Sequence, residues 1–103
     1  MKLMTKEIEK KIPALYSTDK IPNDDKICHV KFFHPLCQKT WFAVEYDPKE
    51  KLFFGWVDGD FPEWGYFSLK EMESLKVRGL GMERDMYFAS RPMKYINYYQ
   101  KCM

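Results

Sequence analysis

The sequence predicts an α+β fold, in which one antiparallel sheet of three or four strands packs against a capped helix and further helices flank both termini. Stretches that alternate between the two faces of a strand recur between residues 27 and 67, separated by short turns rich in Asp, Pro and Gly. Apolar residues at helical spacing occur on both sides of this region. The chain has 103 residues and no internal linker, so residues 1–103 are expected to form one domain.

The first expected element is a short helix near the N-terminus. Thr5 is a suitable N-cap, Ile8 and Ile12 repeat at the four-residue spacing of one helix face, and Pro13 ends the pattern. The following segment, residues 17–26, is polar, contains a proline and shows no periodicity. It is therefore expected to be a surface loop.

Three strands joined by short turns should then form an antiparallel meander. Their expected ranges are 27–33, 40–46 and 51–57, with 65–67 as a candidate fourth strand. In the first strand Cys28, Val30 and Phe32 should share one face. The third strand, KLFFGWV, has apolar residues on both faces and should lie inside the sheet. Gly55 at its centre should allow a ring or a backbone to approach closely.

A second helix should begin after Ser68, because Ser68 and Glu71 form a capping-box pattern. It is predicted over residues 69–76. The residues expected to face the sheet are Leu69, Met72, Leu75 and Lys76. Residues 86–88 should be extended, and Ser90 should cap a last helix with Pro92 in its first turn.

Charge is distributed unevenly, although the net charge of +2 is too small to indicate nucleic acid or an anionic membrane. Acids dominate residues 45–63 and cations dominate residues 64–103. The acids are Glu45, Asp47, Glu50, Asp58, Asp60 and Glu63. They are either ordinary soluble turn residues or a partner-binding face. Further along, Glu83, Arg84 and Asp85 should form an ion-pair cluster that holds their loop against the sheet.

Cysteine and histidine gather in one stretch, which raises zinc as a possible cofactor. Cys28, His34 and Cys37 are the candidate ligands, with Cys102 or a carboxylate as the fourth and His29 pointing away. The spacing matches no known zinc finger, and Cys28 can equally be a small core residue. An odd number of cysteines without a secretory signal or a membrane-spanning apolar run indicates a reducing, cytoplasmic setting.

Catalytic patterns are missing from the sequence, so a non-enzymatic protein is expected. A Cys/His pair lacks an orienting third group and an oxyanion hole, and there is neither a glycine-rich phosphate loop nor an HExxH helix. The C-terminal segment offers an alternative function, in which Arg91, Lys94, Tyr95 and Tyr98 bind single-stranded nucleic acid by phosphate contact and stacking. The simpler interpretation is that its tyrosines are core and helix-surface residues.

Four motifs carry a family resemblance. They are IPALY at 12–16, FGWVDG at 54–59, GYFSLKE at 65–71 and GLGMERD at 79–85. With them, nearly the whole chain resembles the domain-of-unknown-function family numbered twenty-nine fifty-eight. Cys28, His34, Cys37 and the tail after Ser90 fall outside the pattern associated with it.

Members of that family are similar in being small proteins of phages, plasmids and integrative elements, and they share no agreed activity. The resemblance implies an accessory of mobile DNA that works in the cytoplasm of a host bacterium. A common task of such accessories is to block restriction or CRISPR defence. The expected function is an anti-CRISPR or anti-restriction inhibitor whose acids occupy the basic channel of a nuclease such as a CRISPR effector.

Overall fold

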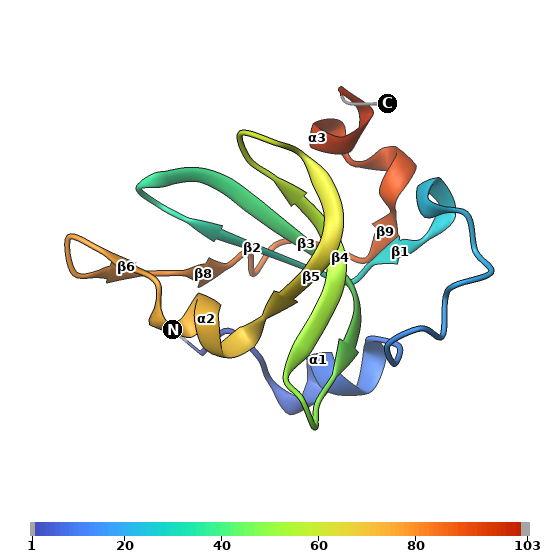
Figure 1. Ribbon diagram of the computed structural model, residues 1–103, viewed down its shortest axis with the longest axis horizontal. Helices are drawn as coiled ribbons and strands as arrows, with labels where there is room; N and C mark the ends of the chain where they lie inside the picture. The colour runs from blue at the N-terminus through green and yellow to red at the C-terminus, as the bar shows by residue number, and fades with distance from the viewer. Residues whose placement is uncertain (1, 102–103) are drawn as a thin grey trace.

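The computed structural model describes residues 2–101, which are arranged around a five-stranded antiparallel sheet in the order β5-β4-β3-β2-β8 (Figure 1). The strands are β2 (Val30–His34), β3 (Cys37–Asp47), β4 (Leu52–Asp58), β5 (Glu63–Ser68) and β8 (Glu83–Arg84). The meander from β2 to β4 and the strand after it were predicted, and β8 adds a fifth. The α+β class is confirmed.

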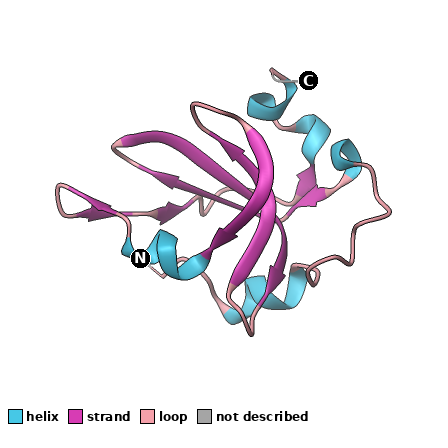
Figure 2. Ribbon diagram, in the orientation of Figure 1, coloured by secondary structure: helices cyan, strands magenta, loops and turns pink. Residues whose placement is uncertain are grey.

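Short helices and small ladders surround the sheet (Figure 2). The helices are α1 (Lys6–Lys11), α2 (Leu69–Ser74) and α3 (Asn97–Gln100), with 3-10 turns η1 (Asn23–Asp25) and η2 (Met93–Tyr95). The ladders pair β1 (Ile27–Cys28) with β9 (Arg91–Pro92) and β6 (Lys76–Val77) with β7 (Leu80–Gly81). Within the described part of the chain, no helix is long and apolar enough to cross a membrane.

Two of the three predicted N-caps, Thr5 and Ser68, are present. The Thr5 hydroxyl accepts a hydrogen bond from the Ile8 N–H at 3.2 Å, and the Ser68 hydroxyl accepts one from the Glu71 N–H at 3.2 Å. Each bond satisfies a backbone donor that has no partner within the first helical turn. Helix α2 ends at Ser74, earlier than predicted, because Lys76 starts the β6–β7 hairpin and is exposed instead of facing the sheet.

Apolar residues cover the sheet on both faces, so the molecule has two cores. The first core lies under α1, α2 and the N-terminal segment; it contains Leu3, Met4, Ile12, Val30, Phe32, Trp41, Ala43, Tyr46, Phe53, Phe67, Leu69, Met72 and Met82. The second core lies under the C-terminal segment; it contains Cys28, Phe42, Val44, Trp56, Met93, Ile96 and Tyr99. Strand β4 contributes to both, with Phe53 in one and Trp56 in the other. Its predicted place inside the sheet is confirmed.

A β-bulge in β3 changes which side chains reach each core. The pairing with β4 shifts between Ala43 and Glu45, which leaves one extra residue in β3. Tyr46 therefore lies in the first core with Trp41 and Ala43, whereas strict alternation would place it with Val44 in the second core.

Three local predictions were wrong. The predicted first strand is interrupted at residue 29, between β1 and β2. Cys28 therefore lies in the second core, while Val30 and Phe32 lie in the first. Ser90 does not cap a helix, because residues 91–92 are extended and pair with β1; α3 begins only at Asn97. Residues 86–88 form a turn after β8.

Candidate functional site

Glu45 was predicted to be on a partner-binding surface, but it is buried, with 1% of its surface exposed. Its carboxylate accepts hydrogen bonds from the Tyr16 N–H at 2.8 Å, from the Thr18 N–H at 3.0 Å and from the Thr18 hydroxyl. The buried Lys26 ammonium donates to the Thr18 carbonyl and, at 3.0 Å, to the Thr18 hydroxyl oxygen. Glu45 therefore holds the 17–26 segment onto the sheet, and it is a structural residue.

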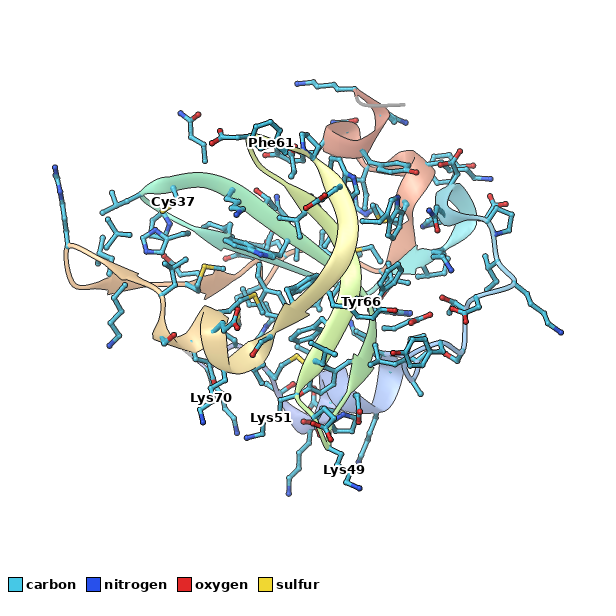
Figure 3. The ribbon with its side chains drawn as sticks, viewed as in Figure 1. Cys37, Lys49, Lys51, Phe61, Tyr66 and Lys70 are labelled. Carbon is cyan, nitrogen blue, oxygen red and sulfur yellow. The ribbon has the colours of Figure 1, made fainter. Side chains whose placement is uncertain are left out.

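The remaining five acids do not share one face. Asp47 and Glu50 lie at the β3–β4 turn, whereas Asp58, Asp60 and Glu63 lie at the β4–β5 turn. These turns are at opposite ends of β4, as the labels of Lys49 and Phe61 in Figure 3 show. Seven residues of strand separate them by about 20 Å. A single six-acid surface is therefore ruled out.

What remains is a small acidic turn with a ring at its tip, which we call the acidic turn (Asp58, Asp60, Phe61 and Glu63). Phe61 is 85% exposed and stands out at the end of the β4–β5 hairpin (Figure 3). Desolvation raises the pKa of the Asp58 carboxyl, and the charge of Lys101 opposes that rise. Such a turn combines negative charge with an apolar anchor, although sequence analysis took it only as a source of charge.

Of the three proposed zinc ligands, His34 and Cys37 are neighbours but Cys28 lies apart from them. Cys28 is fully buried in the second core, where desolvation raises the pKa of its thiol to about 12. His34 lies opposite Cys37 across β2 and β3, but both of its ring nitrogens are engaged: Nε2 is 2.8 Å from the Leu80 carbonyl and Nδ1 accepts from the Leu36 N–H at 3.0 Å. Among residues 2–101, no group of His, Cys, Asp and Glu could hold a metal ion; Cys102 lies outside the described residues.

The Glu83–Asp85 segment is part of the scaffold as predicted, but its first two residues form a strand and not the expected loop. Residues 83–84 form β8 and pair with β2, and the Arg84 guanidinium donates at 2.7 Å to the carbonyls of Lys2 and Leu3. Asp85 contributes an ion pair with Lys31, with Nζ 3.7 Å from Oδ2. The segment therefore ties the N-terminus to the edge of the sheet.

His29 and Ser90 form a pair that the sequence did not suggest. The His29 Nδ1 lies 3.1 Å from the Ser90 hydroxyl, and desolvation lowers the pKa of the imidazole. A nucleophilic serine would also need a group that orients the histidine. The charge of Lys11 also lowers the pKa of His29. The pair links β1 to the C-terminal segment and is best explained as structural.

The four residues of the alternative nucleic-acid site lie on the C-terminal segment, and they differ in exposure and in the contacts that they already make. Tyr95 and Tyr98 are 62% and 44% exposed, whereas the neighbouring Tyr99 is buried against Trp56 and Trp64. The Lys94 ammonium pairs with Asp25 at 3.0 Å, and the Arg91 guanidinium lies over the Phe88 ring at 4.8 Å.

A groove joins this segment to the turn after β8. Two adjoining hollows form it, of about 550 Å³ and about 190 Å³, and both are lined by Lys31, Asp85, Tyr87 and Tyr98. Lys39 and Asp58 lie at the end near the β2–β3 turn, and Arg91 and Tyr95 lie at the other end. We call it the tyrosine groove. Tyr87, which is 96% exposed, and the two lysines Lys31 and Lys39 were not among the four residues predicted for this function.

Comparison with known proteins gives a family but no activity. A family model with the description "Protein of unknown function (DUF2958)" matches residues 3–102. The match includes the tyrosine-rich segment after Ser90, which had been expected to fall outside the family pattern. No curated protein and no solved structure matches the chain.

Proposed function

Since this chain belongs to the family of proteins of unknown function DUF2958, we propose its role from its own surfaces. It is a non-enzymatic counter-defence protein of a mobile element, of the anti-CRISPR or anti-restriction type, and it inhibits a host nuclease by binding it. The mobile-element setting is part of the proposal and comes from the resemblance of the four motifs. The binding surface is the acidic turn.

The observation that carries the proposal is the exposed Phe61 among three carboxylates. A large ring that is 85% exposed at a hairpin tip is an apolar anchor of the kind that dominates binding energy at protein interfaces. Asp58, Asp60 and Glu63 lie within three residues of it in the same turn, and their negative charge complements the basic channel through which a nuclease holds nucleic acid. A narrow hairpin turn can enter such a channel, which a flat sheet face cannot.

Charge reversal tests this contact. Pull-down from a host lysate with the purified protein first identifies the nuclease, and inhibition of its cleavage activity is then titrated. The triple variant Asp58→Lys, Asp60→Lys, Glu63→Lys should inhibit at least tenfold less well, because complementary charge accelerates association by about 10- to 1,000-fold. Phe61→Ala should weaken inhibition by about 30-fold, the equivalent of a 2 kcal/mol hot spot.

The matched control is Asp47→Lys with Glu50→Lys, which reverses charge at the opposite end of the sheet and should leave inhibition unchanged. Circular dichroism should show that all variants remain folded. Full inhibition by the triple variant would remove the acidic turn from the mechanism. A lysate that yields no nuclease would contradict the counter-defence role itself.

The second candidate function is binding of single-stranded nucleic acid by the C-terminal segment. The exposure of Tyr95 and Tyr98 favours it, because rings that served only the core would be covered as Tyr99 is. A gel shift of labelled single-stranded DNA should depend on salt and be lost when Arg91, Lys94 and Tyr98 are replaced. Absence of any shift at low salt would dismiss this function.

A further inference from the structure

We propose that the tyrosine groove, and not the C-terminal segment alone, is a binding site for one strand of nucleic acid. The inference rests on the second candidate function and makes it specific, and it concerns a surface that shares only Asp58 with the acidic turn. It assigns roles to Tyr87, Lys31 and Lys39, which precede the C-terminal segment in the sequence and line the groove beside it. The rings, the cations and the shape of the groove each favour a single strand as its occupant.

Tyr98 and Tyr87 provide two stacking surfaces, of which the first is already packed on one side and the second is almost fully exposed. Tyr98 is held from one side, with its ring centroid 5.8 Å from that of Phe42 and the Lys31 ammonium 5.0 Å from it, while 44% of the residue is exposed. A ring that is already fixed loses little conformational entropy when a base stacks on it. Tyr87 is almost fully exposed, so an aromatic surface is available on the other wall of the groove.

The Tyr87 wall is itself positioned by its neighbours. The Asp85 carboxylate accepts a hydrogen bond from the Tyr87 N–H at 2.9 Å through Oδ1, and its Oδ2 lies 3.7 Å from the Lys31 ammonium. Asp85 therefore fixes the turn that carries Tyr87 while Lys31 compensates its charge. A carboxylate in this position is compatible with a phosphate backbone that passes along the other side of the groove.

The remaining charges favour an anionic occupant by a small margin. Lys31, Lys39 and Arg91 line the groove against two carboxylates, Asp58 and Asp85. The Arg91 guanidinium lies over Phe88, which holds it in place for phosphate oxygens. The Lys39 ammonium lies 5.7 Å from the ring centroid of Trp41, a residue of the first core, so the flexible Lys39 side chain must turn towards the end of the groove that it lines. Because the surplus is small, stacking must supply most of the affinity.

A small positive surplus combined with exposed rings favours binding of a single strand over binding of a duplex. The bases of a duplex are already stacked on each other and cannot reach Tyr87 or Tyr98, and three cations are too few for strong non-specific duplex binding. An unpaired strand can place bases on both rings while its phosphates meet the cations. DNA and RNA share this chemistry, and the experiment distinguishes them.

Fluorescence anisotropy with the full chain tests the site. The probes are 5′-labelled dT and rU oligonucleotides of about 12 nucleotides, within the usual site size for such grooves, and a duplex of equal length. At about 50 mM salt, Tyr87→Ala should weaken single-strand binding by about 5- to 150-fold, the range for loss of one stacked base. Tyr87→Phe keeps the ring and should bind as the wild type does.

Salt dependence provides a second, independent readout. The slope of log affinity against log salt should be close to −1.4, since about 0.7 is contributed by each phosphate that a cation neutralises in a single strand. Only Lys39 and Arg91 are counted, because Lys31 is already paired with Asp85. Lys39→Gln should reduce that slope by about 0.7. The matched control is Phe61→Ala, which removes an exposed ring from the acidic turn and should leave strand binding unchanged.

The outcomes separate this inference from the function on which it rests. Single-strand binding that is lost in Tyr87→Ala supports the groove, whether dT, rU or both bind. Binding that is lost in Lys94→Gln, outside the groove, but kept in Tyr87→Ala would overturn the groove and leave the C-terminal function standing. Equal affinity for the duplex would also overturn the groove. No binding of either oligonucleotide at low salt would overturn both.

Discussion

At the scale of the residue, Glu45 shows that the role of a charged side chain depends on whether it is buried or exposed. Its carboxylate is out of contact with water and accepts three hydrogen bonds from residues 16 and 18. Burying an ionised group costs several kcal/mol unless hydrogen bonds compensate it. The network therefore holds together as a unit, and removal of one member leaves the other polar groups without partners.

Glu45→Ala should lower the free energy of unfolding by about 3 kcal/mol, because it leaves the Tyr16 and Thr18 N–H groups unsatisfied in a buried site. Urea denaturation followed by circular dichroism measures the change. Glu50→Ala, at an exposed acid of the neighbouring turn, should stay within about 0.5 kcal/mol of the wild type. A Glu45→Ala protein as stable as that control would show that the network is not formed.

The buried thiol of Cys28 should make the free energy of unfolding depend on pH. Burial in the second core raises its pKa from 9.0 to about 12, so between these values the unfolded chain releases a proton that the folded chain retains. The stabilising effect is complete below pH 9 and is lost as the pH rises towards 12. Between pH 9 and 11 it should decrease by about 2 kcal/mol.

Urea denaturation at pH 9, 10 and 11 tests this, with Cys28→Ala as the comparison. The variant is expected to be less stable at every pH but to lose less stability as the pH rises, because the linked proton is gone. Thiol-specific alkylation mapped by mass spectrometry gives a second check, in which native protein reacts at the half-exposed Cys37 and not at Cys28. Parallel pH profiles for the two proteins would contradict the assignment.

At the scale of the element, the contact between β3 and β4 depends on Gly55. A Cβ atom at this position would lie 1.9 Å from the Phe42 carbonyl oxygen and 3.0 Å from the Ala43 Cα. Both atoms belong to backbone within the sheet, so the strand itself would have to move. The close backbone approach predicted for Gly55 is therefore confirmed, and it coincides with the start of the bulge in β3.

Gly55→Ala should destabilise the protein by about 3 kcal/mol, at the upper end of the usual cost of overpacking, because no side chain can rotate away. Thermal unfolding measures the effect. Gly65→Ala is a matched control on β5, where a Cβ would meet nothing within 4 Å and the change should be neutral or slightly stabilising. Equal melting temperatures for the two variants would refute the close approach.

At the scale of the whole molecule, the C-terminal segment completes the fold. The face of the sheet that presents Phe42 and Trp56 is covered by Met93, Ile96 and Tyr99, and β9 fastens this segment to β1. The Met93 N–H also donates to the Lys26 carbonyl at 2.9 Å. The family match over residues 3–102 includes this segment, in agreement with its structural role.

Met93→Ala should cost about 2 to 5 kcal/mol, the usual range for truncation of a fully buried methionine. Met86→Ala is the control, because Met86 is 64% exposed in the turn after β8 and its replacement should change stability by less than about 0.5 kcal/mol. Denaturation with urea compares the two. A small effect at Met93 would mean that the second core contributes little to stability.

The sequence alone determined the elements that depend on near neighbours. Caps at Thr5 and Ser68, the meander with β4 inside it, and the need for glycine at position 55 could all be predicted. These features follow from spacing of two to four residues and from local turn chemistry. The α+β class followed from them.

Features that depend on partners far along the chain became visible only in the folded structure. It buried Glu45 under residues 16–18, divided the acids between two ends of β4, moved Cys28 away from His34 and Cys37, and turned the expected start of the last helix into a strand paired with β1. It also left Tyr87 and Phe61 exposed, which are the residues on which the proposed contacts rest. Burial and long-range pairing depend on which distant segments of the chain come into contact. A local pattern of residues carries no information about those contacts.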